Sequence, residues 1–138
     1  MHLFLLYDLV IGNNVLAHVP DINSFVAGLA AVLKPEGTIT MEFPQLIQNS
    51  QFDTIYHEHF YYLSLTAVQK IFQTHGLEIY DVELLETHGG SLRIYAAHRS
   101  YGMVRMEGSV SNLLAQEKSF GLLLLKKEWA RHCFGNQI

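Results

Sequence analysis

Cysteine is nearly absent from this chain, which has one, Cys133, in 138 residues. A single thiol cannot build an intrachain disulfide framework or a zinc site with several cysteine ligands, so neither supports this fold. Proteins with so little cysteine are typical of a reducing compartment. We therefore expect a cytoplasmic location.

Positive charge and long apolar runs are also scarce. Nine Lys and Arg residues face 13 Asp and Glu residues, for a net charge of -4 and a pI near 6.0. This balance gives no basic footprint for nucleic acid. The apolar first residues lack a preceding Lys or Arg and are interrupted by Asp8, unlike a secretory signal, and no later run is long enough to span a bilayer. We expect neither nucleic acid nor membrane as a partner.

The first half of the chain has the pattern of a strand, a helix and a second strand. Hydrophobic residues make up 49% of the chain, enough for a globular core. The run Tyr7–Ile11 is typical of a strand buried on both faces, and residues 22–33 have helical periodicity. Residues 38–43 are typical of a second strand, because their first three residues are β-branched. Between helix and second strand, we expect Gly37 to turn the chain with a positive φ. The order predicts a parallel βαβ unit.

The second half predicts a helix followed by a hairpin. Ser64 is a suitable N-cap for a helix over residues 65–74, and Gly76 is suited to end it in the left-handed conformation. The runs 77–85 and 91–97 are joined by a segment with a glycine pair, which is typical of antiparallel hairpins.

The residue pattern changes after Arg99. Residues 100–108 resemble a linker, and apolar positions from Ser109 to about Phe134 suggest one or two helices. We therefore divide the chain into residues 1–99 and a linker with a helical segment over 100–138. The solid apolar run Leu122–Leu125 predicts that this piece packs against something, and a partner outside the chain is one possibility.

The segment Tyr56, His57, Glu58, His59, Phe60 is the most informative in the chain. Imidazole exchanges a proton near neutral pH, because its ordinary pKa is about 6.5, and Glu58 between two histidines is placed to orient one of them or to stabilise its charge. The alternative is a polar loop that crosses the top of a sheet with solvated histidines. Spacing alone does not choose between these interpretations.

A second cluster comprises His88, Gly89, Gly90, Ser91 and Arg93. The glycines allow the backbone to approach a substrate closely, and Arg93 is suited to pair with an anionic group. The alternative is an ordinary hairpin with a solvated arginine.

Polar residues also follow the first predicted strand. Asn13 and Asn14 stand where ligands bind in open α/β sheets, beyond the carboxyl end of the strand. His18 comes shortly after and either faces the same crevice or merely flanks the next helix. His57 and His59 lack the further ligands of a tetrahedral shell, so we expect no metal.

Four motifs in order carry a family resemblance: YDLVIGNNVLAHVPD, FVAGLAAVLKPEGTITMEFP, YHEHFYYLS and THGGSLRIYAAH. Together they resemble the sugar C-methyltransferases, which use S-adenosylmethionine to methylate a carbon of a nucleotide-linked 4-keto-deoxysugar. The resemblance covers about residues 7–98. It implies an α/β fold, namely the C-terminal half of a Rossmann-like class I methyltransferase sheet with a terminal antiparallel hairpin, followed by a helical tail.

The resemblance also assigns roles to residues. His59 corresponds to the base that removes a proton beside the ketone, with Glu58 and Tyr56 as its polar neighbours. Asn13 and Asn14 are expected at the S-adenosylmethionine site. The residues expected to contact the nucleotide-linked keto sugar are Asn14, His18, His57, His88, Gly89, Gly90, Ser91 and Arg93.

The chain departs from the family pattern at its start. It has no GxGxG loop after a strand and no acidic residue placed to hold the ribose of the methyl donor. We therefore expect a fragment that begins at the fourth strand of the sheet. Its open edge is expected to pair with another copy or with a complementing chain. The alternative function is that of a nonenzymatic remnant, or an interaction module that binds another chain.

Overall fold

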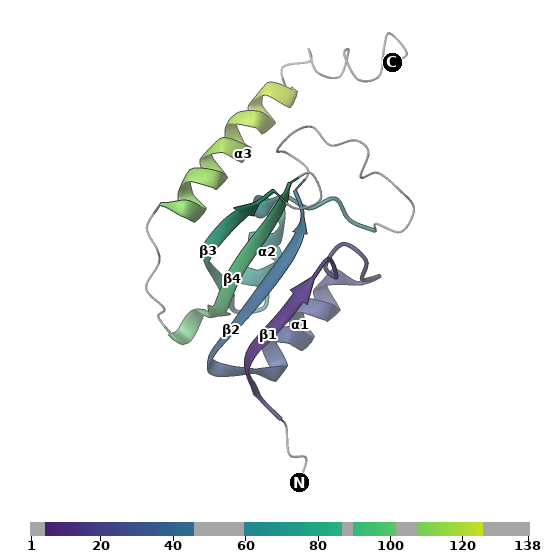
Figure 1. Cartoon of the computed structure of the whole chain (residues 1–138), viewed down its shortest axis with the longest axis vertical. Helices are drawn as coiled ribbons and strands as arrows, with labels where there is room; N and C mark the ends of the chain where they lie inside the picture. The colour runs from purple at the N-terminus through teal and green to yellow at the C-terminus, as the bar shows by residue number, and fades with distance from the viewer. Residues whose placement is uncertain (1–4, 46–59, 87–89, 102–107, 126–138) are drawn as a thin grey trace.

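One mixed sheet organises the part of the chain that the computed structural model describes, residues 5–45, 60–86, 90–101 and 108–125. Its strands lie in the order β1-β2-β4-β3, as Figure 1 shows. The elements in chain order are β1 (Tyr7–Asn13), α1 (Ile22–Val32), β2 (Leu33–Pro44), α2 (Leu65–Thr74), β3 (Leu77–Leu85), β4 (Ser91–His98), the short 3-10 helix η4 (Arg99–Tyr101) and α3 (Ser109–Leu125).

The predicted βαβ unit is confirmed. β1 pairs parallel with β2, from Leu9 opposite Thr38 to Asn13 opposite Glu42, and α1 joins them. The Asp21 side chain caps the start of α1, because it accepts hydrogen bonds from the backbone amides of Asn23 and Ser24. Such a cap satisfies donors that the first helical turn leaves without a partner.

The connection from α1 to β2 differs from the prediction. β2 already begins at Leu33, which lies opposite Tyr7, and the register with β1 shifts before Thr38. Gly37 does not take the positive φ that we expected. Glycine is needed there for another reason: a Cβ would lie 2.9 Å from the carbonyl oxygen of Tyr7. Close approach of two strands, rather than a turn, explains this glycine.

The predicted helix and hairpin are confirmed. The Ser64 hydroxyl accepts a hydrogen bond from the Ala67 amide at 3.2 Å, and Gly76 follows α2 with a φ of 74°. β3 and β4 pair antiparallel. β4 also pairs antiparallel with β2, which makes the sheet mixed.

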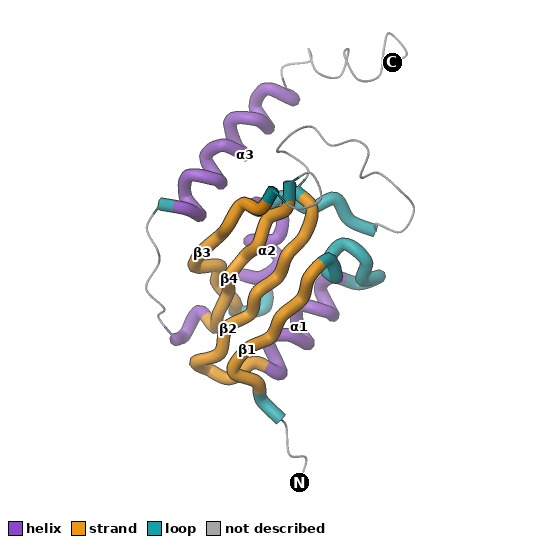
Figure 2. Tube along the Cα trace, in the orientation of Figure 1, coloured by secondary structure: helices purple, strands orange, loops and turns teal. Residues whose placement is uncertain are grey.

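The sheet has one covered face and one open face. Ile39, Met41 and Phe43 alternate along β2, are at most 1% exposed and share one core cluster with residues of α1 and α2, the two helices that lie on one side of the sheet (Figures 1 and 2). The intervening residues Thr40 and Glu42 point to the other face, because side chains alternate along a strand. No helix of the described segments lies over that face.

The C-terminal helical segment is partly described. α3 is a single helix, and its residues Val110 and Leu113 belong to the same hydrophobic core as the sheet. Residues 126–138 lie outside the described residues. The division after residue 99 stays a prediction.

An exposed apolar edge is present, as expected, but the run Tyr7–Ile11 is not buried on both faces as its apolar pattern predicted. β1 is the outer strand of the sheet, and the exposed fractions of Leu9 and Ile11 are 52% and 62%. Leu5, Leu6 and Tyr7 extend this surface toward the start of the strand. None of the helices in the described ranges has the length and apolar character needed to cross a membrane.

Candidate functional site

The carboxyl ends of β1 and β2 form the centre of the candidate site. Asn14 follows β1 with a φ of 54°, in the left-handed region that asparagine tolerates better than most residues. The backbone amide of Asn14 donates a hydrogen bond to the backbone carbonyl of Glu42 at 2.8 Å. The bond fixes the chain as it leaves β1, so Asn13 and Asn14 lie at the edge where ligands bind in such sheets.

The segment after β1 meets the end of the YHEHF motif. The Phe60 amide donates to the carbonyl of Ala17 at 2.9 Å, and the Tyr61 hydroxyl donates to the carbonyl of Pro20 at 3.0 Å. His18 lies between these two acceptors. Two segments about forty positions apart in the chain are therefore tied together beside the carboxyl edge of β1.

The hairpin between β3 and β4 reaches the same edge. Ser91 begins β4 opposite Pro44 of β2, and the backbone amide of Gln45 donates to the backbone carbonyl of Gly90 at 3.3 Å. Gly90 has a φ of 128°, which only glycine adopts readily. Asn14, His18, Gly90 and Ser91 thus belong to loops and strand ends at one edge of the sheet.

Arg93 lies two residue pairs further into the sheet than Ser91, opposite Glu42 on β2 and Glu83 on β3. Its guanidinium contacts the Glu42 carboxylate at 2.9 Å and the Glu83 carboxylate at 3.3 Å. The hydrogen bond to Glu42 is the main cause that raises the pKa of Arg93, with Tyr95 as the next. The guanidinium of Arg93 is therefore already paired with carboxylates of the protein itself. Its role toward a substrate stays a prediction.

Six of the predicted site residues lie outside the described residues: Tyr56, His57, Glu58, His59, His88 and Gly89. Their roles also stay predictions. Within the described segments, no group of three His, Cys, Asp or Glu residues is arranged to hold a metal ion.

Two residues at the carboxyl end of β2 were missed by the sequence analysis. Glu42 is 7% exposed despite its charge, and the alternation in β2 placed it on the polar face without indicating its partner. Gln45 is 2% exposed, and its side-chain Oε1 is buried with no hydrogen-bond partner in the described part of the chain. A buried amide oxygen without a partner is costly, and no sequence signal pointed to it.

Comparison with known proteins identifies the class. The profile of the methyltransferase domain family matches residues 3–82. The chain is 40% identical over 117 residues to the C-methyltransferase NovU of Streptomyces niveus, a match that covers 83% of this chain and 28% of NovU. The chain belongs to the methyltransferase domain family, which confirms the family resemblance found in the sequence.

Solved structures show the same fold. Magnesium protoporphyrin IX methyltransferase (ChlM) of Synechocystis PCC 6803, with bound SAM, matches with a TM-score of 0.51 and 20% identity over 68% of this chain and 40% of its own. The N-methyltransferase NodS of Bradyrhizobium japonicum WM9, in complex with S-adenosyl-L-homocysteine, matches with a TM-score of 0.51 and 14% identity over 71% of this chain and 49% of its own. The predicted Rossmann-like class is confirmed. The chain spans just over a quarter of NovU and less than half of each solved structure.

Proposed function

We propose that this chain supplies the acceptor side of the active site in an S-adenosylmethionine-dependent C-methyltransferase. Its substrate is a nucleotide-linked keto-deoxysugar, methylated at the carbon beside the ketone. The hydrogen bond from Phe60 to Ala17 carries the proposal. Because Phe60 directly follows His59 in the chain, this bond holds the end of the YHEHF motif next to the loop after β1.

The reaction requires a base, since a C–H bond has no free electron pair with which to attack a methyl group. His59 takes the α proton, and the electrons of the broken C–H bond move to the ketone oxygen as an enolate. Imidazole is a far weaker base than an enolate, so donors must stabilise the oxygen as its charge develops. Tyr56 or His57 donates to it, and Glu58 orients the base. With the methyl donor bound, this α carbon would form the new C–C bond to its methyl group, while the electrons of the broken S–C bond would stay on sulfur and S-adenosylhomocysteine would leave.

S-adenosylmethionine, when bound, supplies an electrophilic methyl group on sulfur. Asn13 and Asn14 are the residues of this chain that hold its polar groups. They fit that role because Asn13 is exposed at the carboxyl end of β1, and the left-handed Asn14 turns the following chain away from that end. Both side chains carry hydrogen-bond donors and acceptors.

The donor site is completed by a further strand that adds to β1. The exposed apolar face of β1 supports this step, because an open edge strand with apolar side chains favours pairing with another strand. The added strand belongs to a complementing chain segment or to a second copy. We expect sedimentation to show self-association of the isolated chain, and we expect Ile11→Lys to reduce it. Leu84→Lys is the matched control, because Leu84 is an exposed residue of β3, the opposite edge strand. A wild-type chain that remains monomeric would exclude a second copy as the source of the added strand and leave the complementing chain segment.

The base is tested by exchange of the α proton in D2O. A nucleotide-linked 4-keto-deoxysugar is incubated with the chain alone, and with the chain joined to an upstream half-domain that carries a glycine-rich loop. His59→Gln is expected to slow exchange by about 10²- to 10⁴-fold, the usual contribution of a general base. His75→Gln is the control, because His75 ends α2 and contacts Asn23 instead of the carboxyl edge.

The outcomes separate three conclusions. Exchange that is lost in His59→Gln and kept in His75→Gln supports the base assignment. Exchange of equal rate in His59→Gln and wild type means that another group is the base. If neither form of the protein exchanges or methylates a keto sugar, the proposed function is wrong, and the interaction module becomes the better interpretation.

A further inference from the structure

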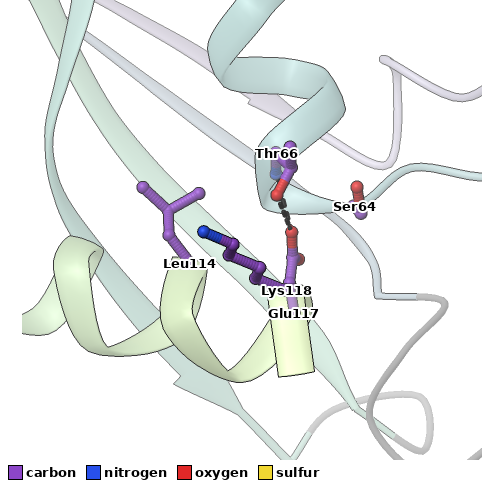
Figure 3. Close-up of a pocket in the computed structure, with 5 residues that line it drawn as sticks. All are labelled: Ser64, Thr66, Leu114, Glu117 and Lys118. Carbon is purple, nitrogen blue, oxygen red and sulfur yellow. Dashed lines mark hydrogen bonds between the residues drawn. The ribbon is translucent and has the colours of Figure 1, made fainter. Parts of the chain in front are cut away.

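The start of α2 is held by a residue from the far end of the described chain. The Glu117 carboxylate of α3 accepts hydrogen bonds from the amides of Leu65 and Thr66, at 2.6 and 2.7 Å. It also accepts one from the Thr66 hydroxyl at 2.6 Å. Figure 3 shows Glu117 pointing from α3 toward Thr66. Glu117 is 4% exposed, so these contacts lie inside the protein.

This carboxylate completes the cap of α2. The first amides of a helix have no partner within the helix, and the partial positive charge of that end attracts an anion. Ser64 satisfies the amide of Ala67, and Glu117 satisfies the two amides before it. A buried carboxylate that receives three hydrogen bonds is strongly held, because bonds to charged acceptors are about twice as strong as neutral ones.

α3 is anchored at a second point that does not involve α2. The Ser109 hydroxyl donates to the Asp81 carboxylate of β3 at 2.6 Å. Val110 and Leu113, between the two anchors, are 7% and 5% exposed. α3 is therefore held against the sheet by its first turns as well as by Glu117, so that the two contacts can be removed separately.

A short segment connects the start of α2 to the candidate site. Phe60 and Tyr61 are bonded to the loop after β1, and Leu63, which precedes the cap residue, is 4% exposed. This segment is pinned at both ends, by the loop at one end and by α2 at the other.

We propose that Glu117 is a positioning residue: by fixing the first turn of α2 it fixes residues 60–63, and through them the end of the YHEHF motif. The structural part of this inference does not depend on methyl transfer. Its catalytic consequence rests on the proposed function. α3 would then be part of the machinery that shapes the site, and changes in its docking would be felt there.

The test measures amide hydrogen exchange, residue by residue, in the full chain. In Glu117→Ala we expect exchange at least tenfold faster at Leu65 and Thr66, and also at Phe60 and Tyr61. Glu117→Gln keeps the shape and one acceptor oxygen, so a smaller increase at the same four amides is expected. It also serves if the alanine variant fails to fold.

Two controls isolate the role of the carboxylate. Gln116→Ala shortens an exposed neighbour on the same helix and should leave all four amides unchanged. Ser109→Ala removes the other anchor of α3 and should affect β3 near Asp81 more than the start of α2. Sodium formate, compared with sodium chloride at equal ionic strength, should restore protection in Glu117→Ala, because formate replaces the missing carboxylate at the helix end.

Results at the two pairs of amides decide the matter. Faster exchange at Leu65 and Thr66 with unchanged exchange at Phe60 and Tyr61 would overturn the proposal, since the cap would then be local. If the chain methylates a keto sugar, Glu117→Gln should lower kcat with little change in KM for the methyl donor. Absence of any activity would count against the proposed function, while the exchange data would still decide the positioning role.

Discussion

The pairing of Arg93 with Glu42 gives a quantitative prediction. Their charged groups are 2.9 Å apart, and the exposed fractions of the two side chains are 32% for Arg93 and 9% for Glu42. A hydrogen bond to a charged group contributes about 1.5 to 3 kcal/mol. Because about a third of Arg93 is in contact with solvent, the lower end of this range applies. Replacing Arg93 by Met should therefore lower the free energy of unfolding by about 2 kcal/mol, including its weaker contact with Glu83.

A double-mutant cycle tests whether this energy belongs to the pair. Glu42→Gln removes the charge and keeps the shape, and it should cost about 1 kcal/mol, since the amide still accepts a hydrogen bond. With both substitutions the loss should be about 1 kcal/mol smaller than the sum of the single losses. Urea unfolding of the four proteins measures each term. Losses that add to within about 0.3 kcal/mol would refute the argument, because independent sites behave in that way.

Three further predictions follow from local features of the fold. The pKa of Asp21 is lowered, mainly by the hydrogen bond from the Ser24 side chain. The contribution of Asp21 to stability is therefore present above the ordinary carboxyl pKa and is lost as the pH falls through the folded value. Between about pH 6 and about pH 2.5, the melting temperature should fall less steeply in Asp21→Asn than in wild type. Phe72 is 0% exposed, so Phe72→Ala should cost about 3 to 5 kcal/mol in urea unfolding, and a loss below about 1 kcal/mol would mean that the site is not packed as described. Gly28→Ala should stabilise the folded protein by about 0.5 to 1 kcal/mol, because Gly28 lies inside α1 with open space around it. Gly76→Ala should destabilise it by about 1 kcal/mol, because Gly76 has a φ of 74°. Equal effects of the two substitutions would contradict the assigned conformations.

The sequence determined the features that depend on neighbours along the chain. The N-cap at Ser64, the left-handed glycine after α2 and the paired strands β3 and β4 all follow from residues a few positions apart, and the structure has them where they were predicted. Gly37 shows the limit of local rules. Its identity suggested a turn, but the carbonyl of Tyr7 on a neighbouring strand is what excludes a side chain there.

The tertiary structure alone decided the contacts between distant segments. The bond from Phe60 to Ala17, the pairing of Arg93 with Glu42, and the cap that Glu117 provides for α2 each join residues more than forty positions apart. The sequence does not indicate which partner a polar side chain has, because the same carboxylate can accept hydrogen bonds from a guanidinium, a helix end or water. Only the packing of α3 against α2, and of β2 against β4, brings one partner close enough and excludes the others.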